Sequence, residues 1–151
     1  MRKKFIILIG SVVTLCFSAT GWAVGHFEGH WVSKTGKVTS NIGINGDCTK
    51  VEILITQDEH QLLTKSYRAE CGTYSSDWGP VPEEIHGGQI LEGGDQVGTI
   101  DDKALKTSTP DSGVLYNYNL ELQGAGRMHS TYGTQNFVGS ITIEADMVQE
   151  P

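Results

Sequence analysis

Basic residues are scarce in this 151-residue chain. Eleven Lys and Arg residues stand against 18 Asp and Glu residues, so the formal net charge is −7 at pH 7. Proteins that bind nucleic acid or anionic membranes carry basic patches that neutralise phosphate groups. The composition therefore predicts no nucleic-acid partner and no attraction to an anionic membrane. An acidic surface suits a cationic partner, or it simply keeps the protein soluble.

Catalytic motifs are missing as well. The sequence has no Gly-x-Ser-x-Gly motif and no Gly-x-x-x-x-Gly-Lys phosphate loop, and its five histidines show no His-Glu-x-x-His spacing. Two acidic pairs, Glu83-Glu84 and Asp101-Asp102, fall at predicted turns, where acidic side chains usually cap the turn in solvent. We therefore expect a protein that is not an enzyme and holds no resident cofactor.

Long hydrophobic runs are confined to the first 23 residues. Arg2, Lys3 and Lys4 precede an apolar run over residues 5–17, and small residues follow up to Ala23. This order is typical of a signal peptide, and the run is shorter than the roughly 20 residues of a membrane-spanning helix, so an uncleaved anchor is the less favoured alternative. We expect residues 1–23 to be removed on export to the periplasm or the outside of the cell.

The predicted mature chain is a single domain over residues 24–151, with 8 basic and 18 acidic residues and a net charge of −10. Cys16 lies in the predicted signal peptide, so only Cys48 and Cys71 remain. Two cysteines in an oxidising compartment predict one disulfide. Apolar-rich stretches flank the polar residues 58–61 and indicate a hairpin, and a turn at the centre of that segment would place the two cysteines opposite each other.

The strand register of this hairpin stays open. The register that aligns the cysteines places the apolar Val51, Ile53 and Ile55 opposite polar residues of the second strand. A shift of one residue would restore the apolar pattern but would misalign the cysteines, because each such shift turns every side chain to the other face.

Alternation of apolar and polar residues is the dominant pattern of the chain, and helical periodicity is absent. Apolar residues occupy alternate positions over residues 114–122, and they share one face from Phe137 to Met147. Turn signals separate such stretches at spacings of roughly 10 residues. We interpret the proline-containing segment 75–84 as a loop or a sheet crossing. The pattern predicts an all-β domain, a single antiparallel up-and-down β-barrel of about eight strands with one disulfide.

Gly29-His30-Trp31 at the first predicted strand and Arg127 ahead of the last one resemble the lipocalin and calycin pattern. The resemblance implies that Trp31 closes one end of a lipocalin-like barrel and that the guanidinium of Arg127 packs across the indole. It also implies the function that we favour, an exported non-enzymatic protein that holds a small apolar ligand inside the barrel.

Ser112-Gly113-Val114-Leu115-Tyr116 is similar to the Ser-Gly-x-x-Tyr motif of periplasmic lysozyme inhibitors. In that family the serine and the tyrosine enter the lysozyme cleft, which would give Ser112 and Tyr116 this contact. An acidic protein also complements a basic lysozyme. The alternative function is therefore inhibition of lysozyme. Tyr116 falls on the same alternating face as Val114, however, which indicates that its side chain points inward.

The predicted mature amino terminus reads Val24-Gly25-His26. A free amine followed by a histidine at the third position resembles the amino-terminal copper and nickel motif, in which four nitrogens bind Cu(II) or Ni(II) in a plane. Val24, Gly25 and His26 are thus candidate metal ligands. We expect such binding to be adventitious.

Overall fold

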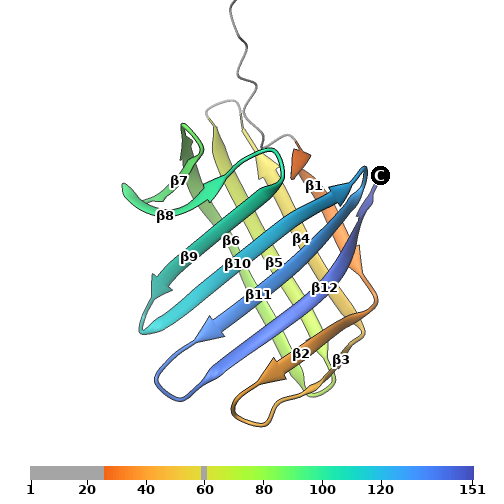
Figure 1. The fold of residues 1–151 in the computed structure, drawn as a ribbon. Coiled ribbons are helices and arrows are strands. Elements are labelled where there is room, and N and C mark those ends of the chain that lie inside the picture. Colours follow the sequence, from red (N-terminus) through yellow and green to blue (C-terminus); the bar gives the residue numbers. More distant parts are fainter. Residues whose placement is uncertain (1–25, 59–60) are drawn as a thin grey trace, which may run out of the picture.

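The computed structural model describes residues 26–58 and 61–151, and these residues form one antiparallel sheet of twelve strands (Figure 1). No helix among them is long and apolar enough to cross a membrane. The strands are β1 (Gly29–Ser33), β2 (Gly36–Ser40), β3 (Gly46–Cys48), β4 (Lys50–Gln57), β5 (Leu62–Cys71), β6 (Tyr74–His86), β7 (Gln89–Glu92), β8 (Asp95–Ile100), β9 (Ala104–Asp111), β10 (Val114–Gly124), β11 (Arg127–Gln135) and β12 (Ser140–Glu150).

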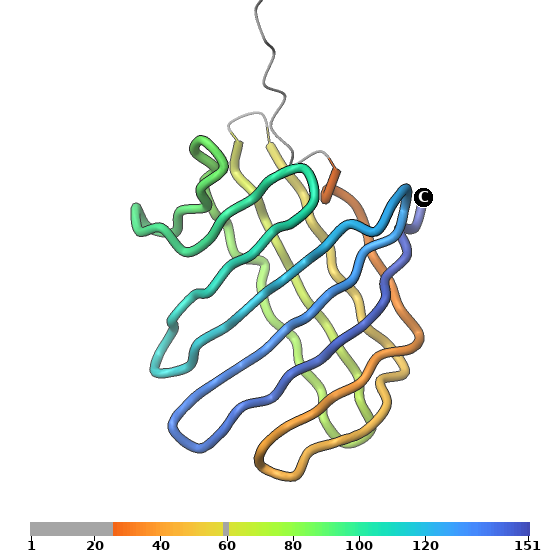
Figure 2. The backbone as a smooth tube through the Cα atoms, in the orientation of Figure 1, coloured from red at the N-terminus to blue at the C-terminus, as the bar shows by residue number. Residues whose placement is uncertain are grey.

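The sheet closes on itself as an up-and-down barrel. From β4 to β12 each strand pairs with the next one along the chain, and β1 completes the ring by pairing with both β4 and β12. β2 pairs with the early part of β12, and β3 pairs with β2 and leads into β4. The backbone trace shows this closed wall (Figure 2). The predicted all-β barrel is confirmed, with ten strands in the closed ring and two additional short strands rather than about eight.

Two features explain the higher strand count. The segment 75–84, which we interpreted as a loop or crossing, belongs to the long strand β6, which pairs with β5 through residues 74–84. Over residues 74–83 the edge of β6 that faces away from β5 has no partner strand among the described residues, and such an edge tolerates Pro80 and Pro82. The short β7–β8 hairpin, which has no clear alternation in the sequence, supplies the other strands.

The β4–β5 hairpin adopts the second of the two registers considered, the one that keeps the apolar positions of the two strands opposite each other. Ile53 pairs with Tyr67 and Ile55 with Lys65, one residue away from the register that would align the cysteines directly. The inward positions of β4 therefore meet the inward positions of β5.

The disulfide between Cys48 and Cys71 forms nevertheless, as predicted. Cys48 belongs to β3, and the chain passes through Thr49 before β4 begins. Because Thr49 lies between the two strands, it takes up the offset of one residue, and its N–H bonds the carbonyl of Glu70 at 2.9 Å. Both sequence signals are thus satisfied together.

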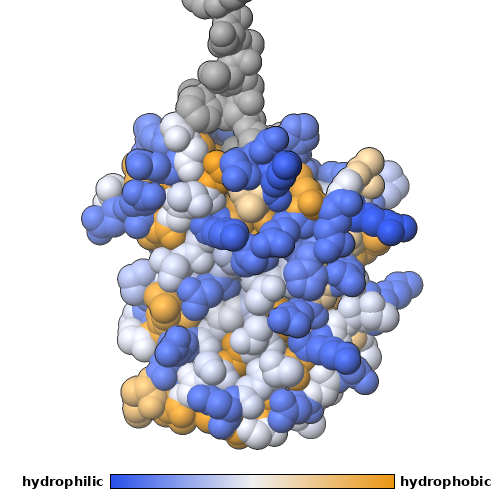
Figure 3. Space-filling view, in the orientation of Figure 1, coloured by the Kyte–Doolittle hydropathy of each residue, from blue (hydrophilic) through white to orange (hydrophobic). Residues whose placement is uncertain are grey.

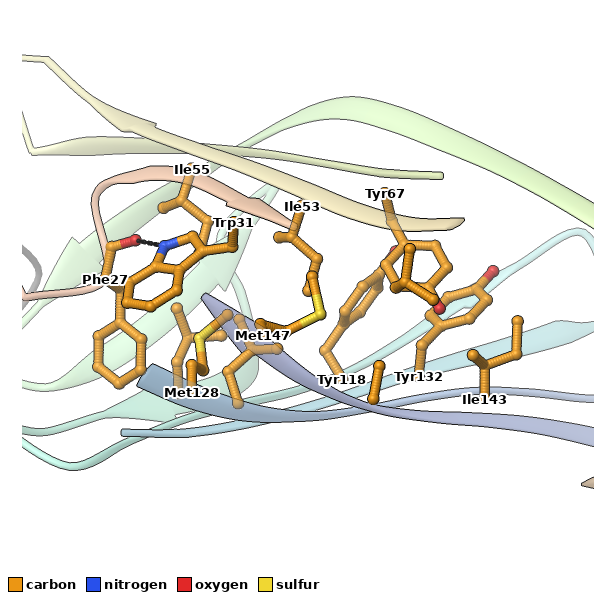
Figure 4. Packing of buried hydrophobic residues seen from close by; sticks show 14 of the residues in the cluster. Phe27, Trp31, Ile53, Ile55, Tyr67, Tyr118, Met128, Tyr132, Ile143 and Met147 are labelled. Carbon is orange, nitrogen blue, oxygen red and sulfur yellow. Dashed lines mark hydrogen bonds between the residues drawn. The ribbon is translucent and has the colours of Figure 1, made fainter. Parts of the chain in front are cut away.

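The hydrophobic core lies inside the barrel. Trp31, Met128 and Met147 are buried side by side, and the indole Nε1 of Trp31 donates a hydrogen bond to the carbonyl of Phe27 at 2.8 Å (Figure 4). The outer surface in Figure 3 is largely hydrophilic. One expected inward residue departs from this division, because Phe137 lies in the β11–β12 turn ahead of β12 and is 98% exposed.

Candidate ligand site

Aromatic side chains gather inside the barrel. The ring of Tyr67 stacks on the ring of Tyr132 with centroids 4.2 Å apart, and the ring of Tyr118 lies 4.9 Å from that of Tyr132. Trp78 lies 5.0 Å from Tyr118 and 6.0 Å from Tyr116, centroid to centroid. We call these five residues the aromatic cluster; Figure 4 shows its three most buried tyrosines.

Strand register assembles the aromatic cluster. Tyr67 on β5 is the direct partner of Trp78 on β6, and Tyr118 on β10 is the direct partner of Tyr132 on β11. Such partners point to the same face of a sheet, with Cβ atoms about 4.5–5.5 Å apart. Closure of the barrel then brings the two pairs face to face across the interior.

A buried ion pair lies against the aromatic cluster. The ammonium of Lys65 is 2.8 Å from Oε2 and 3.1 Å from Oε1 of Glu83, and it donates to the hydroxyl of Thr107 at 2.9 Å. The same nitrogen lies 5.0 Å from the ring centroid of Tyr118, within cation–π distance. The side chains of Lys65 and Glu83 are 1% and 0% exposed. We call Lys65, Glu83, Thr107 and the neighbouring Glu92 the polar cluster.

Burial acts on the protonation of both charged groups. It lowers the pKa of Lys65 from its usual value, although the carboxylate of Glu83 opposes that change. It raises the pKa of Glu83, although the ammonium of Lys65 opposes that one. Because desolvation disfavours both charged forms, the pair is held together in the barrel by its mutual attraction and by the contacts to Thr107 and Tyr118.

Several buried oxygens in the interior receive or donate no hydrogen bond within the described residues. They include the hydroxyls of Tyr67, Tyr118 and Ser130 and one carboxylate oxygen of Glu92. Burial raises the pKa of Tyr67 and that of Tyr118, and it raises the pKa of Tyr132 to about 12. These phenols are therefore protonated at neutral pH and can donate a hydrogen bond as well as accept one.

The aromatic cluster becomes more exposed toward the β9–β10 turn. Along β10, Leu120 and Tyr118 are buried, whereas Tyr116 is only partly buried. Trp78, which stacks on Tyr116, is partly buried as well. The opposite end holds the buried Trp31. The aromatic cluster therefore runs from the middle of the barrel to its less covered end.

Trp31 and Arg127, which were predicted to close one end of the barrel together, do not lie against each other. Trp31 is 1% exposed, whereas Arg127 is exposed and no contact between the two side chains is found in residues 26–58 and 61–151. Alternation on β11 explains this, because the neighbouring Met128 occupies the inward position. The guanidinium therefore does not pack across the indole, and the cation that does lie over a ring is Lys65.

The predicted lysozyme-contact residues lie in different environments. Ser112 is exposed in the β9–β10 turn, where its hydroxyl donates to the carboxylate of Asp111 at 2.9 Å. Tyr116 points inward and stacks on Trp78, as the alternation indicates. The turn therefore presents the serine without the tyrosine.

The predicted metal motif falls mostly outside the described residues, which do not include Val24 or Gly25. His26 is described and exposed, and it lines a hollow of about 520 Å³ beside Trp31. Among the described residues no group of three or more His, Cys, Asp or Glu side chains could hold a metal ion.

Sequence reasoning missed the polar cluster. Lys65, Glu83 and Thr107 alternate in phase with apolar inward residues of their strands, such as Leu63, Ile85 and Leu105. A charge at an inward position is the signal that could have identified the cluster. This signal could not be recognised from the sequence. The register of the first hairpin was open, and the segment 75–84 was interpreted as a loop, so the inward positions of these two strands were not known.

Comparisons with known proteins identify the fold and not a family. No protein family matches the sequence, and no curated protein is similar to it. Solved structures with a similar fold exist. One is an S-type phycobiliprotein lyase, CPES, from Guillardia theta, with a TM-score of 0.54 and 9% sequence identity, over 85% of this chain and 93% of that one.

A second similar structure is a protein of unknown function from the DUF3598 family of Nostoc punctiforme. It has a TM-score of 0.56 and 15% sequence identity, over 83% of this chain. The present chain spans about half of that protein, 48% of its length. Identities this low establish a shared fold, and activity lies in the residues of a site rather than in the fold.

Proposed function

We propose that this chain is an exported, non-enzymatic binding protein that holds a small ligand with an apolar body inside a lipocalin-like barrel. The predicted signal peptide and the disulfide both suit an oxidising compartment outside the cytoplasm. The similar fold of a phycobiliprotein lyase supports a barrel of this kind as a binding scaffold.

The observation that carries the proposal is the set of buried hydroxyls of Tyr67, Tyr118 and Ser130, which have no hydrogen-bond partner among the described residues. A buried polar group without a partner destabilises a protein by about 1–3 kcal/mol. A ligand with hydrogen-bonding groups on an aromatic or aliphatic body would bind these hydroxyls and stack on the rings around them.

The lysozyme-inhibitor alternative requires Ser112 and Tyr116 to reach one partner together. Because Tyr116 stacks on Trp78 and Ser112 lies in the turn, no observation favours that function over ligand binding. A lysozyme assay run beside the binding experiment distinguishes the two.

The test is native mass spectrometry of the mature protein purified from the compartment to which it is exported. We expect one molecule of a small organic compound per chain, or uptake of one apolar fluorescent probe after extraction with solvent. Absence of both, together with lysozyme inhibition that is lost in Ser112→Ala, would contradict the proposal and favour the alternative.

A further inference from the structure

Two turns at one end of the barrel carry large apolar side chains in solvent. Phe137 and Val138 form the centre of the β11–β12 turn and are 98% and 61% exposed, and Ile42 in the β2–β3 turn is 47% exposed. Only two other large apolar side chains of the described residues are exposed, Leu54 on β4 and Val148 near the end of β12. We call Ile42, Phe137 and Val138 the apolar tip.

The two turns lie side by side. The N–H of Asn41 donates to the carbonyl of Ser140 at 3.3 Å, and the N–H of Ser140 donates to Oδ1 of Asn41 at 2.8 Å. A Cβ atom at Gly139 would meet the side chain of Ile42, so the two turns are in close contact. Figure 3 shows hydrophobic side chains at the end of the molecule where the two turns lie in Figure 1. The members of the apolar tip thus belong to one patch.

The β11–β12 turn differs in composition from the other hairpin turns. Such turns are usually built from small and polar residues. This holds for Gly72-Thr73, Gly87-Gly88, Gly93-Gly94, Ser112-Gly113 and Ala125-Gly126. Phe137 and Val138 contribute little to folding, because their side chains stay largely in solvent. Their position favours contact with a partner outside the chain.

The backbone behind the apolar tip is already hydrogen-bonded. Oδ1 of Asn136 accepts from the N–H of Val138 at 2.9 Å and from that of Gly139 at 3.1 Å, and the N–H of Asn136 donates to the carbonyl of Gly139 at 2.9 Å. In the β2–β3 turn the hydroxyl of Ser40 accepts from the N–H of Ile44 at 2.6 Å. Because an apolar medium disfavours free N–H and carbonyl groups, these bonds make it easier to remove the tip from water.

Neither turn carries a charged residue. Residues 38–46 and 130–143 contain no Asp, Glu, Lys or Arg. The exposed carboxylates of Asp47 and Asp111 lie at the ends of strands that meet this end of the barrel, and the predicted mature chain as a whole is acidic. An uncharged lipid surface therefore suits the apolar tip, whereas anionic lipids would repel the protein.

The apolar tip is too small for a stable contact between two proteins. A standard interface buries about 800 Å² on each partner, whereas one aromatic side chain supplies only about 150–250 Å². Val138 and Ile42 add less, because they are already partly covered. A second copy of the chain would therefore bury too little area. Insertion among lipid chains needs no matching protein surface, and its strength grows with the apolar area that is buried.

We propose that the apolar tip is a membrane-contact site, through which the protein binds reversibly to a bilayer with uncharged headgroups. Phe137, Val138 and Ile42 insert beside the headgroups, and the barrel stays in water. The β9–β10 turn lies at the same end of the barrel (Figure 1), so this contact brings the less covered end of the aromatic cluster toward the lipid. The inference goes beyond the proposed ligand binding and does not depend on it.

Flotation of the mature protein with phosphatidylcholine vesicles tests the contact. We expect part of the protein to float with the vesicles. The bound fraction should fall when phosphatidylglycerol replaces part of the phosphatidylcholine, because the anionic surface repels the acidic barrel. Added salt should restore binding to the mixed vesicles, since it screens this repulsion.

Matched variants locate the contact. Phe137→Ser should lower the partition coefficient at least about tenfold, the loss expected when one large apolar side chain no longer inserts. Val138→Ser and Val148→Ser make the same change at valines that are 61% and 51% exposed, and only the first should weaken binding. In Phe137→Trp, the emission of the new indole should shift to shorter wavelength when vesicles are added. Circular dichroism checks that the variants fold.

Three results would overturn the proposal and leave ligand binding untouched. The first is that no protein floats with phosphatidylcholine vesicles. The second is that Phe137→Ser floats as well as the wild type, or that Val148→Ser loses as much binding as Val138→Ser. The third is a concentration-dependent dimer in sedimentation that Phe137→Ser abolishes, which would assign the apolar tip to contact between two copies of the chain.

Discussion

A lysine and a glutamate are rarely both buried, and here Lys65 and Glu83 lie inside the barrel with almost no exposure. Desolvation of the two charges offsets much of their attraction, so a buried ion pair adds little net stability compared with apolar side chains of similar size. The pair as a whole is therefore expected to contribute little to the free energy of unfolding. Removal of only one partner should lower the stability strongly, because the other charge then stays buried without a partner.

Lys65→Met should lower the free energy of unfolding by about 3–5 kcal/mol, because Glu83 would remain buried without its partner. Lys65→Met combined with Glu83→Leu should recover most of this loss. Urea denaturation measures both. The matched control is Lys106→Met, which removes the cation of an exposed pair with Glu121 and should change the stability by less than about 1 kcal/mol. A double variant as unstable as the single one would show that the pair itself stabilises the fold.

At the scale of the strand elements, the sequence predicts well where one face is apolar and the other polar. The alternation over residues 114–122 predicts β10 and its inward tyrosines correctly. The strand prediction fails for β6, because proline was taken as a sign of a loop. β6 has an unpaired edge, and such an edge tolerates proline. The grouping of the polar cluster could not be predicted, since its members come from four strands that only the closed barrel brings together.

The β8–β9 turn depends on one carboxylate. Asp101 accepts hydrogen bonds from the backbone N–H groups of Lys103 at 2.8 Å and Ala104 at 2.7 Å, and these bonds lower its pKa below the usual 3.8. A lowered carboxyl pKa contributes stability above the unfolded value, and this contribution is lost as the pH falls through the folded value.

Asp101→Ala should therefore destabilise the protein at pH 7, and the difference from the wild type should shrink below about pH 3.8. Denaturation curves at several pH values measure this. Asp102→Ala, which removes an exposed neighbour of equal charge, should show no such pH dependence. A constant difference for Asp101→Ala down to pH 2 would argue against the role of the carboxylate.

The Cys48–Cys71 bond links β3 to the end of β5 over a sequence separation of 23 residues. Closure of a loop of this size in the unfolded chain should stabilise the protein by about 3–4 kcal/mol. The double variant Cys48→Ser/Cys71→Ser should lose this amount in urea denaturation, and reductant should have no further effect on it. Equal stability of the wild type with and without reductant would contradict the prediction.

At the scale of the whole molecule, a closed barrel removes all full-length sheet edges, and its acidic surface surrounds an interior that contains aromatic rings. Both features support the proposed capture of a small compound inside the barrel. The predicted metal motif of Val24, Gly25 and His26 shares no residue with the aromatic cluster or the polar cluster.

If export removes residues 1–23, the mature chain should bind one Cu(II) through Val24, Gly25 and His26, with an absorption band typical of square-planar nitrogen ligation. Affinity should fall steeply in acid, because the amine, two amides and the imidazole must all be deprotonated. Visible spectroscopy during a Cu(II) titration measures this. His26→Ala, or one extra residue ahead of Val24, should abolish the band. A band that survives both changes would place the copper elsewhere.

The most direct test of ligand binding inside the barrel is nuclear magnetic resonance of the labelled mature protein during titration with an apolar aromatic probe such as naphthylmethanol. The account predicts that the largest shifts occur at the side chains of Tyr67, Trp78, Tyr118 and Tyr132, while the turn at Ser112 and the exposed Phe137 stay unchanged. Shifts confined to the outer surface, or to the turn at Ser112, would contradict it.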